Sequence, residues 1–106
     1  KELDEEEIIT MVHKFITHSI SHMLGIDVHD CGEINILKEG MVITVEPGIY
    51  FNEELKTDII INQKELKKYF NIGGIRIEDT VLITKNGSKI LNNISKESKT
   101  IEKMIV

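Results

Sequence analysis

The hydrophobic pattern at the start of the chain predicts a helix over residues 4 to about 17. Apolar residues recur there at helical spacing, which indicates that one stripe of the helix faces a core. The stripe consists of Ile8, Ile9, Val12, Phe15 and Ile16. Asp4 is a favourable N-cap, and Glu7, three residues later, completes the pattern of a capping box.

Two later stretches alternate between apolar and polar residues and predict strands. Residues 41–46 place Thr44 and Glu46 on one face, Pro47 and Gly48 interrupt the strand, and residues 49–51 resume it. Residues 74–84 form the second strand, on which one face carries Arg76, Glu78 and Thr80.

The remaining segments predict shorter elements. Residues 52–71 form an excursion between strands, with a helix over residues 63–70 whose inward side chains are Leu66, Tyr69 and Phe70. Asn86-Gly87 is a turn signal, after which residues 89–91 pair back as a hairpin strand. Residues 98–106 form a closing helix. The pattern as a whole therefore predicts both helices and strands.

Composition narrows the possible functions. The 106 residues suit one small domain, and 41% hydrophobic with 29% charged residues is typical of a globular chain. A net charge of −5 argues against a nucleic-acid partner.

Cys31, the single cysteine, indicates a reducing cytoplasm, and we interpret it as a turn residue rather than a nucleophile. No apolar run has the length of a membrane span. Because the sequence begins at Lys1, we expect it to be a piece of a longer protein.

Two carboxylates lie within apolar strand patterns. A carboxylate that faces inward is costly unless it is paired or bound to a metal, and Glu46 and Glu78 both fit this description if their strands are central. The alternative is that each strand has a solvent-facing side and that both carboxylates are hydrated.

Histidines in residues 18–30 offer imidazole ligands. His22 and His29 flank Gly25, and His18 lies four residues before His22. Imidazole with carboxylate suits first-row divalent metals, although histidines in a loop can equally be ordinary polar residues. Arg76 could fix Glu78 or bind a substrate carboxylate, or it could form a surface ion pair.

Three segments together resemble one family. Residues 18–30 (HSISHMLGIDVHD), 37–50 (LKEGMVITVEPGIY) and 74–84 (GIRIEDTVLIT, followed by Gly87) are similar to the signatures of the Xaa-Pro peptidases of the pita-bread metallopeptidase fold. Aminopeptidase P and proline dipeptidase are the members that they resemble most. The resemblance implies an α+β fold, half of a pita-bread domain, with a curved, mostly antiparallel sheet and helices on one side. It assigns residues 1–106 to the carboxy-terminal portion of the catalytic domain.

The resemblance also implies a site with two divalent ions, usually manganese, sometimes cobalt or zinc. It assigns His22, Glu46 and Glu78 as metal ligands and makes Glu46 the general base. His29 and His18 would contact the substrate on opposite sides of the scissile carbonyl, and Arg76 would lie near its proline. The substrate would be a peptide with proline in the second position.

The sequence departs from the family pattern in ways that limit this transfer. Ser19 stands where the family commonly has Gly, and two further aspartate ligands are not supplied before His18. We therefore expect the isolated chain to be inactive and, because half a domain exposes apolar surface, to self-associate. We expect the parent protein to be cytoplasmic and homo-oligomeric, without a nucleic-acid or membrane partner. The alternative is a non-enzymatic pita-bread module that binds peptides or proteins.

Overall fold

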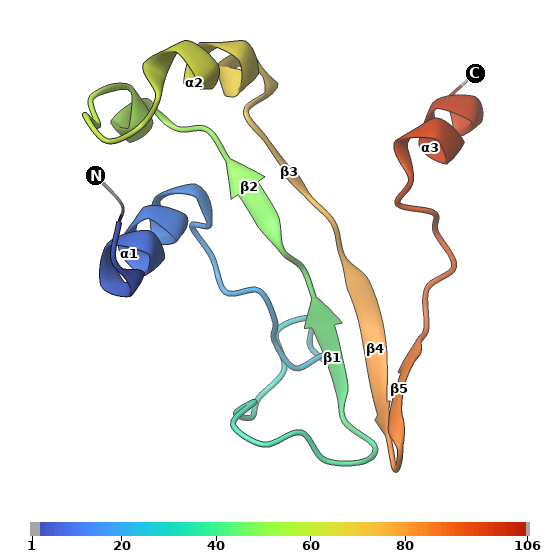
Figure 1. Ribbon diagram of the computed structural model, residues 1–106. Helices are drawn as coiled ribbons and strands as arrows, with labels where there is room; N and C mark the ends of the chain where they lie inside the picture. Colours follow the sequence, from blue (N-terminus) through green and yellow to red (C-terminus); the bar gives the residue numbers. More distant parts are fainter. Residues whose placement is uncertain (1–2, 106) are drawn as a thin grey trace. The chain divides into compact units, whose positions relative to one another are not determined.

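The computed structural model describes residues 3–105, in which three α-helices and two antiparallel sheets form a small α+β structure (Figure 1). The chain divides into two compact units. The first unit contains the described residues up to Ile20 together with Pro47–Arg76, and the second contains Ser21–Glu46 together with the described residues from Ile77 onward. The predicted α+β class is confirmed.

Helix α1 (Glu5–Phe15) of the first unit begins at the predicted capping box. An Asp4 carboxylate oxygen accepts a hydrogen bond from the Glu7 backbone N–H at 2.8 Å, and a Glu7 carboxylate oxygen accepts one from the Asp4 N–H at 3.1 Å. This exchange satisfies two backbone donors that have no partner within the helix, which explains why the helix begins here.

The apolar stripe of α1 does not face a core in the described chain, so that expectation is wrong. No residue of α1 is buried, and Ile8, Ile9 and Val12 are 49%, 51% and 43% exposed. The end of the helix is better packed, since Phe15 meets Phe51 edge to face with ring centroids 6.2 Å apart. An amphipathic pattern determines which face is apolar, but the elements that pack nearby determine how much of it is covered.

Strands β2 (Gly48–Tyr50) and β3 (Gly74–Arg76) form an antiparallel pair, with Gly48 opposite Arg76. The predicted excursion between them consists of the 3₁₀ helix η1 (Glu53–Lys56), helix α2 (Gln63–Tyr69) and the 3₁₀ helix η2 (Phe70–Ile72). Leu55 and Leu66 are buried at its centre, at 1% and 5% exposure. Tyr69, predicted to point inward, is instead 47% exposed.

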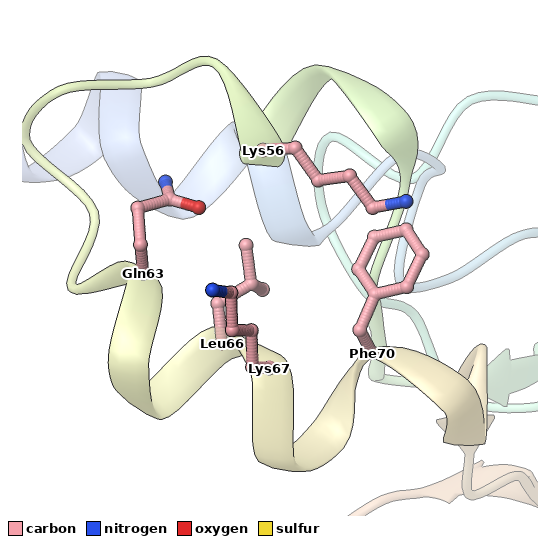
Figure 2. A pocket seen from close by; sticks show the side chains of 5 residues that line it. All are labelled: Lys56, Gln63, Leu66, Lys67 and Phe70. Atoms are coloured by element: carbon pink, nitrogen blue, oxygen red, sulfur yellow. The ribbon is translucent and has the colours of Figure 1, made fainter.

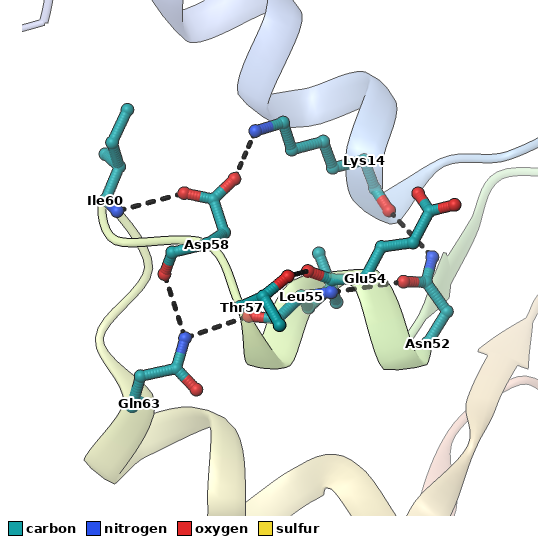
Figure 3. A network of polar contacts seen from close by, with 8 residues as sticks. All are labelled: Lys14, Asn52, Glu54, Leu55, Thr57, Asp58, Ile60 and Gln63. Carbon is teal, nitrogen blue, oxygen red and sulfur yellow. Dashed lines mark hydrogen bonds and ion pairs between the residues drawn. The ribbon is translucent and has the colours of Figure 1, made fainter.

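A polar network around Asp58 fixes this excursion (Figure 3). The Asp58 carboxylate pairs with Lys14 of α1 and accepts the Ile60 N–H at 2.9 Å. The Gln63 side-chain amide donates to the carbonyls of Leu55 and Asp58, at 2.8 and 2.9 Å. The hydrogen bond from Lys14, followed by that from Ile60, holds the pKa of Asp58 below its ordinary value, since both favour the charged form. The network thus ties α1 to the start of α2.

The second unit contains a three-stranded sheet in the order β1-β4-β5, formed by β1 (Val42–Val45), β4 (Asp79–Thr84) and β5 (Gly87–Ile90). Buried Ile43 and Val81 lie directly opposite each other, so two β-branched side chains pack across the strands. The β4–β5 hairpin confirms the predicted turn (Figure 1). Helix α3 (Ser98–Met104) lies where the closing helix was predicted; Val106 is outside the described residues.

The predicted interruption of the first strand is confirmed, since Glu46 and Pro47 separate β1 from β2. Proline has no N–H to donate, which explains this interruption. The second strand, predicted to be continuous over residues 74–84, is instead divided into β3 and β4 by Ile77 and Glu78. Among residues 3–105 no helix is both long and apolar enough to cross a membrane.

Candidate metal-binding site

The segment around His22 is held along the edge of β1. The His22 carbonyl accepts the Thr44 N–H at 2.9 Å, and the Leu24 N–H donates to the Val42 carbonyl at 3.0 Å. Met23 forms an isolated antiparallel bridge with Ile43. These backbone bonds place His22 beside the end of β1 without a helix, in agreement with the β-branched and serine residues that surround it.

Glu46 follows β1 directly and is 7% exposed, which agrees with the first of the two alternatives that the sequence left open, a carboxylate that faces inward. Burial of a carboxylate is costly unless polar partners surround it. One of its oxygens, Oε1, accepts a hydrogen bond from the Thr44 hydroxyl at 2.8 Å. The Glu46 carboxylate is therefore held by the side chain of Thr44, two residues earlier in the chain.

His22 and Glu46 are brought together by these two elements. The His22 Nε2 atom lies 2.9 Å from Glu46 Oε1, and its Nδ1 atom lies 2.9 Å from the Met23 carbonyl oxygen. A carbonyl can only accept, so Nδ1 carries a hydrogen and donates it. The other nitrogen then faces a carboxylate oxygen, and a proton or a metal ion must lie between two such groups. An imidazole oriented by a backbone carbonyl has the usual arrangement of a histidine metal ligand.

His29 joins this pair through its ring. The His22 and His29 ring centroids are 4.5 Å apart and their planes meet at 75°. The loop between them is closed by a hydrogen bond from the Asp30 N–H to the Met23 carbonyl at 3.0 Å. A Cβ at Gly25 would lie 1.8 Å from an Asp30 carboxylate oxygen, so a larger residue there would require Asp30 to move. Gly25 thus lets the Asp30 side chain pack closely within the loop that joins His22 to His29.

Glu78 shares the second unit with His22, His29 and Glu46. The β1–β4 register pairs Val45 with Asp79, and one further step would place Glu46 opposite Glu78. In contrast to Glu46, Glu78 is exposed in this structure. Across residues 3–105, no three His, Cys, Asp or Glu side chains are grouped so that they could hold a metal ion. The two groups that do converge are the imidazole of His22 and the carboxylate of Glu46. Both are ligand types that suit a first-row divalent ion.

Asp79, the residue after Glu78, is engaged elsewhere. Its carboxylate accepts hydrogen bonds from Lys96 and from the Asn92 amide, the latter at 2.9 Å. These two bonds, with that from Lys96 the stronger influence, hold the pKa of Asp79 below its ordinary value. Asp79 thus anchors the segment after β5 to the start of β4.

His18 and Arg76 belong to the first unit. The His18 Nδ1 atom lies 2.7 Å from the Ser19 carbonyl, so Nδ1 donates and Nε2 accepts from the Tyr50 hydroxyl at 2.9 Å. The two rings meet edge to face at 5.3 Å. Arg76 ends β3 and is exposed.

Tyr50 and Thr44 are site residues that the sequence analysis did not assign. Tyr50 packs against two glycines, since an added Cβ would come within 2.7 Å of its hydroxyl at Gly48 and within 2.6 Å of its ring at Gly74. This close approach of glycines is not visible in the pattern. Thr44 did carry a signal, because alternation places it on the same strand face as Glu46.

One cavity in the first unit, of about 350 Å³, has a lining that includes none of the predicted site residues and consists of Lys56, Gln63, Leu66, Lys67 and Phe70 (Figure 2). The Lys56 ammonium lies 3.9 Å from the Phe70 ring centroid and also pairs with Glu53 at 2.8 Å. This lining is apolar and basic, without an acid–base pair, so it is not a candidate for the peptidase chemistry.

Comparisons with known proteins agree on one family. Residues 2–85 match metallopeptidase family M24. An uncharacterised peptidase of Saccharomyces cerevisiae is 37% identical over 99% of this chain and 25% of its own length. The Xaa-Pro dipeptidase of Pyrococcus horikoshii is 40% identical over 79% of the chain and 20% of its own length.

Aminopeptidase P from Escherichia coli, solved with the inhibitor Pro-Leu, superimposes with a TM-score of 0.72 at 35% identity, covering 98% of this chain and 24% of that one. A zinc-substituted form of the same enzyme was solved with product. The chain thus spans about a quarter of the length of these relatives.

Proposed function

The chain belongs to metallopeptidase family M24, and from this membership we propose that the protein containing it hydrolyses the peptide bond that precedes a proline. The substrate is a peptide or dipeptide with proline in the second position. The observation that carries the proposal is the His22–Glu46 pair, in which an oriented imidazole nitrogen faces a buried carboxylate oxygen at 2.9 Å.

We propose that His22, Glu46 and Glu78 are metal ligands of this protein. Two divalent ions, with manganese the first choice and cobalt or zinc as alternatives, would supply Lewis acidity that polarises the scissile carbonyl and acidifies water. His22 suits this role because its Nδ1–H is committed to the Met23 carbonyl, which leaves Nε2 as the donor atom.

The remaining residues handle the substrate and its protons. Glu46 is the general base, since its carboxylate is buried and lies beside the imidazole of His22. His29, whose ring packs against that of His22, contacts the substrate near the scissile carbonyl. His18, oriented by Tyr50, contacts the same region, and Arg76 orients a carboxylate on the proline side.

The isolated chain is proposed to be the carboxy-terminal part of the catalytic domain and to be inactive. Two aspartate ligands expected from the family resemblance would have to come from elsewhere in the parent protein. The parent is proposed to be a cytoplasmic homo-oligomer.

The test is hydrolysis of an Xaa-Pro peptide by the full-length protein. We expect activity with Mn²⁺, its loss on treatment with EDTA, and its recovery when Mn²⁺ is restored. Glu46→Gln should lower kcat by about 10²–10⁴, the range for loss of a general base. Glu39→Gln, an exposed glutamate in a turn, is the matched control and should retain activity.

Two results would contradict the proposal. One is full activity in Glu46→Gln. The other is a protein that binds Xaa-Pro peptides with and without Mn²⁺ but never cleaves them, which would indicate the peptide-binding alternative.

A further inference from the structure

Thr44 is a polar residue in a place where a hydroxyl is costly. It is 2% exposed, in the middle of β1, with the apolar residue Ile43 before it. A buried hydroxyl without partners destabilises a protein, whereas valine has nearly the same shape and a higher strand propensity. The hydroxyl of Thr44 therefore needs an explanation in its contacts.

The Thr44 hydroxyl connects the two halves of the candidate site. Its Oγ1 atom accepts the His22 backbone N–H at 3.1 Å and donates to Glu46 Oε1 at 2.8 Å. The direction of this relay is fixed, because an N–H can only donate and a carboxylate can only accept. Both bonds strengthen each other, since a hydroxyl that accepts one hydrogen bond is a better donor for the next.

The carboxylate oxygen that Thr44 holds is the one that faces His22. Glu46 Oε1 accepts from Thr44 and lies 2.9 Å from His22 Nε2. Thr44 thus touches the backbone of one residue and the functional oxygen of the other. Through these two bonds, Thr44 links the position of the His22 backbone to the side-chain rotamer of Glu46.

From this geometry we propose that Thr44 is a positioning residue, whose hydroxyl holds the Glu46 carboxylate in the orientation needed to bind a metal ion together with His22. The proposal rests on the proposed function and adds a residue that acts through Glu46. Thr44 is not proposed to touch substrate or metal.

The backbone of Thr44 has a separate, structural role that a substitution can preserve. Its N–H donates to the His22 carbonyl at 2.9 Å, and its carbonyl accepts the Ser21 hydroxyl. Neither bond uses the Thr44 hydroxyl. Thr44→Val therefore keeps these contacts and the side-chain shape while it removes the relay, and Thr44→Ser keeps the hydroxyl.

The experiment compares the full-length wild type, Thr44→Val and Thr44→Ser. Metal-free proteins are titrated with Mn²⁺ by calorimetry and with Co²⁺ by visible absorption, and their thermal unfolding is measured without metal. We expect Thr44→Val to weaken Mn²⁺ binding by about 10–100-fold, the range for loss of a group that orients a ligand. Thr44→Ser should remain within about threefold of wild type, because a serine hydroxyl can make the same two bonds. The Co²⁺ spectrum should change in Thr44→Val alone.

A second comparison tests whether Thr44 acts through Glu46. In a Glu46→Ala background, adding Thr44→Val should not weaken Mn²⁺ binding further, as expected for two residues that act as a unit. Thr44→Ala serves as the hydroxyl-free variant if Thr44→Val does not fold.

The outcomes separate this inference from the proposed function. A wild type that neither binds Mn²⁺ nor cleaves Xaa-Pro peptides would overturn the proposed function, and this inference with it. A wild type that does both, beside a folded Thr44→Val with unchanged Mn²⁺ affinity, would overturn the inference alone. A folded Thr44→Ser with the same loss as Thr44→Val would also overturn it, because the effect would then come from packing.

Discussion

The Nε2 atom of His22 lies 2.9 Å from the Oε1 atom of buried Glu46, although the two residues lie near opposite ends of the segment Ser21–Glu46. Backbone pairing along the edge of β1 holds the first residue, and the second follows directly after β1, where the Thr44 hydroxyl holds its carboxylate. Since hydrogen bonds hold both residues beside the same strand, the pair is preorganised, and this reduces the cost of binding a metal ion.

Tyr50→Phe should weaken catalysis without unfolding the protein. The substitution removes the hydroxyl that His18 Nε2 accepts from at 2.9 Å, but it keeps the ring between Gly48 and Gly74. Because a neutral hydrogen bond contributes about 0.5–1.5 kcal/mol, we expect kcat/KM for an Xaa-Pro peptide to fall by about 3–10-fold. Tyr69→Phe, at an exposed tyrosine, is the control. Equal kinetics for wild type and Tyr50→Phe would show that His18 needs no such orientation.

Gly25→Ala should disturb the loop that carries His29. The new Cβ would lie 1.8 Å from an Asp30 carboxylate oxygen, so the side chain or the backbone must move. We expect a loss of unfolding free energy of about 1–3 kcal/mol, as is usual for overpacking, measured by urea denaturation.

A second substitution tests this cause. Asp30→Ala removes the clashing oxygen and leaves a contact of 3.5 Å with the remaining Cβ. The double variant Gly25→Ala/Asp30→Ala should therefore be more stable than the sum of the two single effects predicts. Strict additivity would mean that the cost of Gly25→Ala comes from the backbone rather than from Asp30.

The capping box of α1 and the hairpin turn could be predicted because each depends on residues close in sequence, and Asp4 and Glu7 meet within one helical turn. Alternation placed Glu46 on the same strand face as Thr44, but it left open whether that face is buried. The family resemblance then assigned a role to Glu46.

Other features depend on partners that no local pattern specifies. The sequence identifies the apolar face of α1 but not how far other elements cover it, and it treats Glu46 and Glu78 alike although one is buried and the other exposed. The contact between Tyr50 and His18 joins distant segments, and one of the two glycines that leave room for Tyr50, Gly74, comes from the paired strand β3. Such contacts are set by register, which hydrophobic periodicity leaves open.

Asp58 should make the stability of the protein depend on pH in the acid range. Its pKa is lowered in the folded state, chiefly by the hydrogen bond from Lys14, whereas in the unfolded chain it takes the ordinary value of about 3.9. The unfolded state therefore binds more protons near that pH, so stability is fully present above it and is lost as the pH falls through the folded pKa.

Asp58→Asn is the corresponding variant. Urea denaturation between pH 3 and pH 7 should show a smaller loss of stability at low pH than in wild type, because one coupled carboxylate has been removed. Asp27→Asn, at an exposed aspartate outside the Asp58 network, is the comparison variant. Identical slopes for Asp58→Asn and wild type would show that the ion pair with Lys14 does not form in solution.

The isolated 106-residue chain should self-associate, because α1 presents an uncovered apolar stripe. Ile8, Ile9 and Val12 lie on it at about half exposure, and contiguous apolar surface of this kind is usually buried in an interface. Sedimentation velocity over a range of concentrations should show species larger than a monomer. Ile9→Lys places a charge in the stripe and should shift the distribution toward monomer, whereas His13→Lys, at an exposed position of the same helix, should not. A wild-type chain that stays monomeric at all concentrations would contradict this prediction, and equal shifts in both variants would trace the association to net charge rather than to the stripe.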